Sequence, residues 1–199
     1  MDRFSKSIRK AVQDQNWFSA IFLALALPDI CSALENPPTR QRGEVGERYK
    51  AWFNRYLKKK YDPDSLFDLM SATNPESIEK MDPDSVARLM EMPPNQECAF
   101  TAEDCYRFRC KCLHQGLIER ADGENFIFIT PPPNKNVVHG NSINGRLQLQ
   151  VDVFCEDMCI AVEQWVKDMV GNNAVAARCR ELIEVHNYSE LSPAIVISS

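Results

Sequence analysis

The sequence predicts a mainly α-helical protein, and three observations lead to that prediction. Apolar residues recur at spacings of three and four over most of the chain, which is the period of an amphipathic helix. Residues that suit helix N-caps stand before several of these segments. Only two segments have the pattern of β-strands. Residues 126–130 form a run of β-forming residues, and apolar and polar residues alternate over residues 146–151. We therefore expect one helical bundle over residues 1–199, with a small β-hairpin at about 126–151 and inserted short helices at about 61–95.

Composition limits the classes of function. The 199 residues are 44% hydrophobic, which is enough for one packed core, and the net charge is −5. A negative net charge argues against a protein that coats nucleic acid or an anionic membrane, so any RNA contact must be local. The longest apolar run, near residues 21–27, is shorter than the roughly 20 residues that span a bilayer. The polar N-terminus does not resemble a secretory signal, and we expect a cytoplasmic protein without a membrane partner.

The eight cysteines are expected to be free thiols that are mostly buried, because the cytoplasm is reducing. Cys155 and Cys159 are four residues apart and are predicted to share one buried helix face. A second group lacks the paired Cys-x2-Cys spacing that closes a tetrahedral zinc shell, and consists of Cys105, Cys110, Cys112 and His114. We expect neither a metal nor a cofactor.

Three helices are predicted in the first 60 residues. The first covers residues 2–13, and the second follows Asn16, whose side chain suits an N-cap, and reaches about residue 34. Proline has no amide hydrogen, so we expect a kink at Pro28, with Asp29 as a candidate start of a second segment. The third helix is expected over residues 46–59, with four aromatic residues facing inward: Tyr49, Trp52, Phe53 and Tyr56.

A short repeat marks the insertion. The letters Asp-Pro-Asp-Ser at 62–65 return at 82–85. An aspartate N-cap, a proline at the first helical position and more acid in the first turn are typical of a helix start, so Asp62 and Asp82 are each predicted to begin a short helix. Calcium binding is the weaker interpretation, because no glycine provides the turn of an EF-hand loop.

The second half of the chain begins with a helix over residues 101–115. Thr101 and Asp104 are placed as a capping box, and Gly116 as the C-terminal stop. The two strands are expected to pair as a hairpin whose long loop carries His139, which we expect to be solvated, as is His186. Helices are then predicted over residues 153–169 and 174–185.

The helix at 101–115 combines an apolar stripe with several charged residues. Glu103, Arg107 and His114 project together from one side, and Arg109 lies on the far flank of the stripe. The stripe itself is expected to face the core and consists of Tyr106, Cys110, Leu113 and Leu117.

The run Tyr-Arg-Phe-Arg-Cys-Lys-Cys-Leu-His-Gln-Gly at 106–116 resembles the signature of HEPN proteins. These are α-helical domains, many of them metal-independent ribonucleases of toxin and phage-defence systems, and their signature is an arginine, four to six residues, then a histidine. Arg109 stands at the four-residue spacing from His114, and Arg107 at the six-residue spacing. The family favours the shorter spacing, whereas regular helix geometry places Arg107 and His114 on one face.

The resemblance implies a metal-independent endoribonuclease that acts as a homodimer. Histidine can exchange a proton near neutral pH, and arginine holds phosphate oxygens through a planar, charged fork. By this analogy His114 is the general acid or base, Arg109 or Arg107 holds the scissile phosphate, and Glu103 orients the histidine. A symmetric dimer would supply the second catalytic set. The implied partners are RNA, a second copy, and a cognate antitoxin or regulatory protein.

Other interpretations stay open. A catalytically inactive HEPN-like binding or assembly module is favoured by the net charge and by Cys110, which stands where the family commonly has asparagine or another polar residue. A ligand-sensing regulatory protein, with a small ligand in the helical bundle, is the second alternative. A purely structural role is the third, because an arginine and a histidine near a helix C-terminus commonly bond the last carbonyls.

Overall fold

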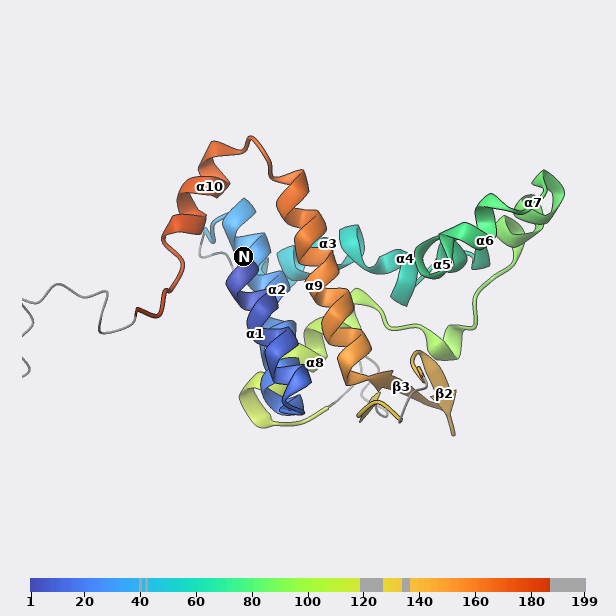
Figure 1. The fold of residues 1–199 in the computed structure, drawn as a ribbon, viewed down its shortest axis with the longest axis horizontal. Helices are drawn as coiled ribbons and strands as arrows, with labels where there is room; N and C mark the ends of the chain where they lie inside the picture. The colour runs from blue at the N-terminus through green and yellow to red at the C-terminus, as the bar shows by residue number, and fades with distance from the viewer. Residues whose placement is uncertain (40, 42, 119–126, 134–136, 187–199) are drawn as a thin grey trace, which may run out of the picture.

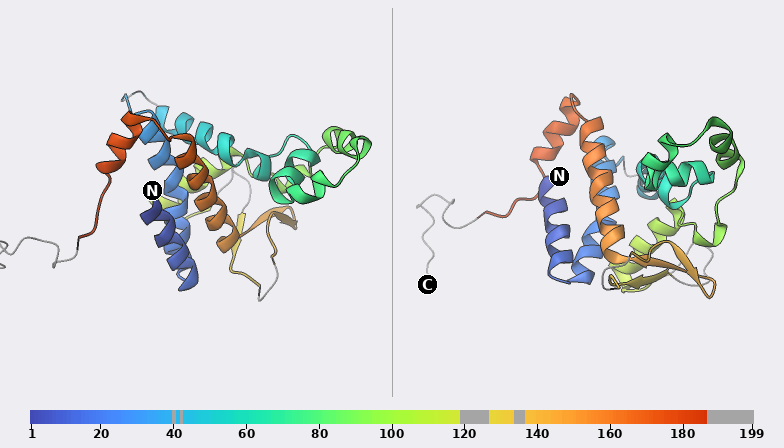
Figure 2. Two further views of the ribbon diagram at one scale, coloured as in Figure 1. Left: turned by 45° about the horizontal axis from the view of Figure 1, so that its top comes forward. Right: turned by 45° about the vertical axis from the view of Figure 1, so that its right-hand side comes forward.

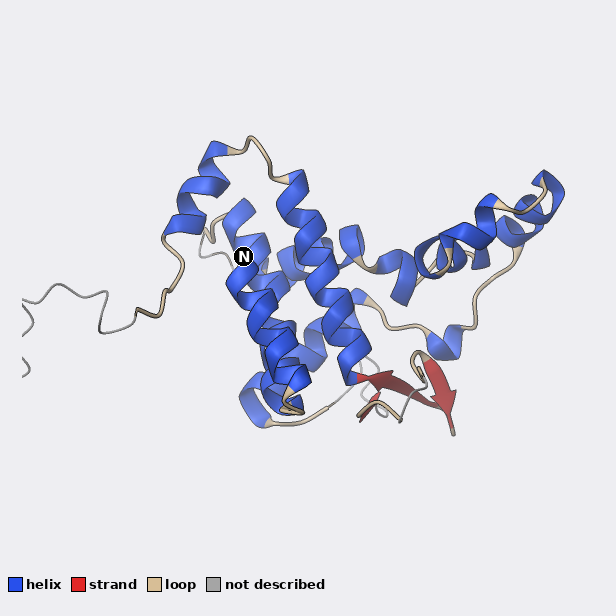
Figure 3. Ribbon diagram, viewed as in Figure 1, coloured by secondary structure: helices blue, strands red, loops and turns tan. Residues whose placement is uncertain are grey.

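A computed structural model describes residues 1–39, 41, 43–118, 127–133 and 137–186. It confirms a mainly helical chain with a small sheet (Figure 1, Figure 3). In order, its elements are α1 (Asp2–Gln13), α2 (Trp17–Glu35), α3 (Glu44–Tyr56), α4 (Lys58–Tyr61), α5 (Leu66–Thr73), α6 (Pro75–Glu79), α7 (Pro83–Glu91), the 3-10 helix η1 (Gln96–Cys98), α8 (Ala102–Gln115), β1 (Ile127–Thr130), β2 (Asn141–Ile143), β3 (Arg146–Gln150), α9 (Val151–Asp168) and α10 (Asn173–Arg180).

Helix α2 lies at the centre and contacts α1, α3, α8 and α9. Its N-cap is Asn16, as predicted, whose side-chain oxygen accepts a hydrogen bond from the Ser19 amide over 3.3 Å. The helix continues through Pro28 to Glu35, so the expected second segment beginning at Asp29 does not form. By length and composition alone this helix could cross a membrane, and half of its most apolar stretch is buried inside the structure. Core helices of soluble proteins and signal sequences both meet the same criterion.

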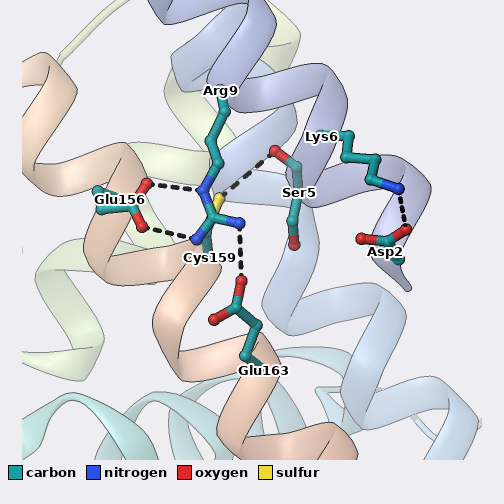
Figure 4. A network of polar contacts seen from close by, with 7 residues as sticks. All are labelled: Asp2, Ser5, Lys6, Arg9, Glu156, Cys159 and Glu163. Carbon is teal, nitrogen blue, oxygen red and sulfur yellow. Dashed lines mark hydrogen bonds and ion pairs between the residues drawn. The ribbon is translucent and has the colours of Figure 1, made fainter.

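Helix α1 is joined to α9 by a polar network (Figure 4). Arg9 donates from Nε and Nη2 to the two carboxylate oxygens of Glu156, over 2.9 and 2.6 Å, and from Nη1 to Glu163 over 2.7 Å. The three side chains are 41–48% exposed, so solvent screens their attraction and each pair contributes little to stability. The network thus links α1 to α9 at the surface, while the packing of the two helices in the core carries more of the stability.

The hydrophobic core draws on α1, α2, α3, α8, α9 and the sheet. Three of the four aromatic residues expected to face inward from α3 are buried, and Tyr56 is half-buried. At the end of the core nearest the sheet, aromatic rings pack mostly edge to face, an arrangement that the ring quadrupole favours; the set is Phe53, Tyr61, Phe100 and Phe154.

The insertion holds the short helices α5, α6 and α7, which extend away from the main helices (Figure 1, Figure 2). Asp82 caps α7 as predicted, since its side chain accepts from the Ser85 amide over 2.9 Å. The prediction for Asp62 is wrong, because that residue ends α4 and Ser65 is the N-cap of α5. Tyr61 explains the difference: its burial in the core closes α4 at this point, so the first copy of the repeat starts its helix three residues later.

The sheet differs from the predicted hairpin. Its strand order is β1-β3-β2, and the two predicted strands, β1 and β3, pair in parallel with Ile127 opposite Leu147. The hairpin is formed by β2 and β3 through Asn144-Gly145, both at positive φ, which is the turn that two-residue hairpins favour. Parallel pairing leaves β3 in the middle of the sheet, with four of its five residues buried.

The last two helices have shifted boundaries. Helix α9 begins at Val151, directly after β3, so the strand predicted to include that residue ends one position earlier. Cys155 and Cys159 share a buried face of α9, as predicted, and all eight cysteines are free. Helix α10 ends at Arg180, five residues before the expected end. The chain from residue 187 onward lies outside the described residues.

Candidate functional site

Both predicted ends of α8 are confirmed. The Thr101 hydroxyl accepts from the Asp104 amide over 3.0 Å, and the Asp104 carboxylate accepts from the Thr101 amide over 3.1 Å, which completes the capping box. At the other end Gly116 has φ +68°, and its amide donates to the Cys112 carbonyl over 3.0 Å. Local sequence thus determines where this helix starts and stops.

The buried face of α8 is not the predicted stripe. Cys105, Phe108 and Cys112 face the core, whereas Leu117, a member of the stripe, is 54% exposed. The helix packs mainly against α3, where Tyr106 lies over Gly46. The rotation arises because Cys105 and Cys112 act as small apolar residues, so the apolar surface of α8 extends further around the helix than the stripe.

Arg109 lies beside this buried face and forms an ion pair with Asp29 of α2. The Nε–Oδ2 distance is 2.6 Å, and the side chains are 20% and 18% exposed. Burial raises the pKa of the Asp29 carboxyl although the arginine opposes the shift. Burial alone would lower the pKa of the Arg109 guanidinium, but Asp29 and Cys110 outweigh it and the net shift is upward. The charge of Arg109 is therefore paired with a carboxylate of the same chain, although the contact does not have hydrogen-bond geometry.

Arg107 and Glu103 lie on the opposite, more exposed side of α8. The Glu103 carboxylate forms one ion pair with Lys50 of α3, over 3.1 Å, and another with Arg107, over 3.6 Å. The Arg107 side chain is 42% exposed, about twice the fraction of Arg109. This row of charges places Arg107 where a ligand in solvent can approach it.

His114 is exposed in the last turn of α8 and makes no side-chain hydrogen bond or ion pair with the described residues. In a regular helix it is about 20° from Arg107 around the axis and about 140° from Arg109. Glu103 is eleven residues away, a rise of roughly 16 Å, so Glu103 does not orient this histidine within one chain. The structure thus brings Arg107 and His114 to one side and leaves Arg109 on another.

A second polar cluster surrounds His139, which was expected to be solvated and is in fact mostly buried. Its Nδ1 accepts a hydrogen bond from the Gln150 amide over 3.0 Å, and its Nε2 lies 3.1 Å from the Tyr61 hydroxyl. The Tyr61 hydroxyl donates to Asp157 over 2.6 Å, and Lys60 contacts the other oxygen of that carboxylate over 2.6 Å.

The direction of these hydrogen bonds follows from the donors. A backbone amide can only donate, so Nδ1 of neutral His139 is the acceptor and Nε2 carries the proton. The Nε2 proton is then donated to the Tyr61 oxygen, whose own proton points to Asp157. Burial lowers the pKa of His139 to about 4, with Lys60 adding to the shift and Asp157 opposing it. The ring is therefore neutral at pH 7.

Two buried glutamines of β3 hold the loop that carries His139. Gln150 accepts from the Val138 amide over 2.7 Å, and Gln148 donates to the Val138 carbonyl over 2.5 Å. The Gly140 amide donates to the Gln148 carbonyl over 2.9 Å. The loop is thus attached to the central strand on both sides of the histidine.

Sequence reasoning missed this cluster because its members are far apart in the chain. Tyr61 is 78 positions from His139 and 96 positions from Asp157, and no motif spacing relates them. One local signal was available, since Asn144-Gly145 between two short β-forming runs predicts the β2–β3 hairpin. That hairpin would have placed His139 directly before a strand.

The fold and these two clusters define the chain only as a mainly α-helical protein with a small three-stranded sheet. No protein-family model, curated protein or solved structure matches the chain. Among the described residues, no group of three or more histidine, cysteine or acidic side chains is arranged to hold a metal ion.

Proposed function

We propose that the protein is a metal-independent endoribonuclease of the toxin or phage-defence type that acts as a homodimer. The observation that carries the proposal is the position of His114 at the exposed end of a regular helix, with Arg107 on the same side two turns earlier. Arg107 and Arg109 each stand at a spacing from His114 that resembles the Arg-x4-6-His signature of HEPN proteins.

Metal-free cleavage of RNA needs two proton transfers. A base removes the proton of a 2′-hydroxyl, the oxygen attacks phosphorus, and an acid protonates the departing 5′-oxygen, which leaves a cyclic phosphate and a 5′-hydroxyl. His114 can serve as one of these groups, and His114 of a second copy as the other. Arg107, the more exposed arginine, would contact the phosphate oxygens, and Arg109 is the second candidate.

Exposed apolar side chains support self-association. Phe18 of α2 is 78% exposed, Phe22 of the same helix is 36% exposed, and Leu117, three residues after His114, is 54% exposed. Large apolar side chains that face water are typical of surfaces that bind another protein. In an isologous dimer the same surface of both copies forms the interface, so an interface that includes Leu117 would bring two copies of His114 near one substrate.

The proposal is tested by incubating the purified protein with mixed RNA in EDTA and resolving the products on a denaturing gel. The native protein and His186→Ala should cleave the RNA, whereas His114→Ala should not. His186 is a suitable control because it is also a largely exposed histidine, near the other end of the described chain. Strict dependence on magnesium, or full cleavage by His114→Ala, would contradict the proposal.

A catalytically inactive binding or assembly module is the second candidate function. The ion pair between Arg109 and Asp29 favours it, because an arginine neutralised within the chain is a weaker phosphate ligand. This candidate predicts no cleavage by any variant, together with RNA or protein binding that Phe18→Asp or Arg107→Ala weakens.

A further inference from the structure

A cavity of about 350 Å³ lies between the insertion and the sheet. Helices α4 and α5 and the segment before and within η1 contribute to its wall, and η1 contacts β2 and β3 on the other side (Figure 1). Its volume falls in the range of small-molecule sites. Most of the surface that the described residues expose to it is apolar, and its apolar lining includes Pro63, Leu66, Leu69 and Pro94.

Polar groups gather on one side of the cavity, where Lys60, Tyr61 and His139 line it. The hydrogen bonds of Tyr61 and His139 are directed to each other, to Gln150 and to Asp157. Lys60 is different, because an ammonium has three donors and its contact with Asp157 uses one of them. The Lys60 side chain is 28% exposed, so it can reach an acceptor placed in the cavity.

The wall beside Lys60 is held in place before any ligand arrives. The His139 ring packs edge to face on Tyr61, with 5.5 Å between ring centres, and the loop around it is bonded to β3. Binding to a rigid wall avoids the entropy cost of ordering side chains. Among the described residues that line the cavity, Lys60 is the one with a permanent positive charge, and it lies beside the mostly buried His139 ring.

We propose that this cavity binds a small molecule with an aromatic or otherwise apolar body and a single anionic group, which pairs with Lys60. The apolar wall takes the body of the ligand, and the ammonium takes its carboxylate, sulfonate or phosphate. This site is separate from α8, so the inference is independent of the proposed nuclease activity. Because the wall includes both the insertion and the sheet, an occupant bridges these two parts of the chain.

The first test uses 1-anilinonaphthalene-8-sulfonate, which has an aromatic body and one sulfonate. Titration followed by fluorescence should show saturable binding of one dye molecule per chain. Lys60→Met and Leu69→Trp should each weaken the affinity at least about fivefold, the first by removing the cation and the second by filling the cavity. Lys59→Met is the matched control, since Lys59 is 73% exposed and does not line this cavity, and it should leave the affinity within about twofold.

A second readout stays valid if Lys60→Met fails to fold. Cys98 lines the cavity and is partly exposed, whereas Cys179 is partly exposed on α10, away from the insertion (Figure 1). Saturating dye should slow alkylation of Cys98 in the native protein, measured by mass spectrometry of its peptide, and leave Cys179 unchanged. Unsaturable dye binding, full affinity in Leu69→Trp, or equal alkylation of Cys98 with and without dye would each overturn the proposal.

Discussion

The amide of Gln150 donates a hydrogen bond to Nδ1 of His139 over 3.0 Å, and Gln150 is also the N-cap residue of α9. A protonated imidazole could not accept this hydrogen bond, and its charge would face the positive end of the helix dipole. The geometry and the burial of the ring therefore favour the same neutral state.

The stability of the protein should fall in mild acid because of His139. Its pKa is about 4 in the folded protein and about 6.5 when the chain unfolds, so the unfolded state takes up the proton first as the pH falls. The contribution of His139 is complete above about pH 6.5 and is lost between about pH 6.5 and pH 4, up to about 3 kcal/mol in total.

Urea denaturation from about pH 7.5 to about pH 5 measures this effect. The native protein should lose more stability over this range than His139→Gln does. His114→Gln is the control, because His114 is exposed and its replacement should leave the pH dependence intact. Identical pH dependence in the native protein and His139→Gln would show that the histidine is not held in its neutral form.

Arg109→Ala should destabilise the fold in addition to any effect on RNA. The substitution leaves the mostly buried Asp29 carboxylate without its ion pair, which should lower the free energy of unfolding by about 1–3 kcal/mol. Arg107→Ala should cost less than about 1 kcal/mol, since its pair with Glu103 is exposed.

A double-mutant cycle with Asp29→Asn checks the assignment of the Arg109 pair. If the two side chains interact, the double variant should lose less stability than the sum of the single variants. Strictly additive losses would mean that Arg109 acts through other contacts. Because of this effect, loss of activity in Arg109→Ala alone does not identify a catalytic residue.

Gly46→Ala should destabilise the protein although alanine favours helices. A methyl group at this position would lie 2.9 Å from two ring carbons of Tyr106, closer than carbon atoms can pack. Overpacking of this kind costs about 1–3 kcal/mol, which exceeds the helix-propensity gain of about 1 kcal/mol at its upper end. Thermal denaturation should show a lower Tm.

The same substitution in a Tyr106→Ala background separates sterics from propensity. With the ring removed, Gly46→Ala should become neutral or stabilising by up to about 1 kcal/mol. Continued destabilisation in that background would mean that the backbone at Gly46, and not the aromatic contact, requires glycine.

Helix boundaries followed the sequence where a short-range signal exists. The capping box of Thr101 and Asp104, the stop at Gly116 and the cap at Asp82 all act within a few residues, and all are present as predicted. The repeat at Asp62 shows the limit of such signals. Its letters match those at 82–85, yet the burial of neighbouring Tyr61 moves the helix start.

The faces of the elements were harder to predict than their positions. The charged residues of α8 were assigned to two sides, and the structure separates Arg107 from Arg109 accordingly. The apolar side was misplaced, because hydrophobic periodicity does not say which part of a broad apolar surface a neighbouring helix will cover. Only the packing of α3 against α8 settles that choice.

The sequence by itself determined that the chain is mainly helical and where most of its helices begin. These properties depend on periodicity, caps and residue types, which act over one or two turns. Tertiary structure alone decided that β1 pairs in parallel with β3 and that Asp29 forms an ion pair with Arg109. It also decided that His139 forms a hydrogen bond with Tyr61 beside a cavity. Those contacts join segments distant in the chain, so no pattern within one or two turns of sequence can specify them.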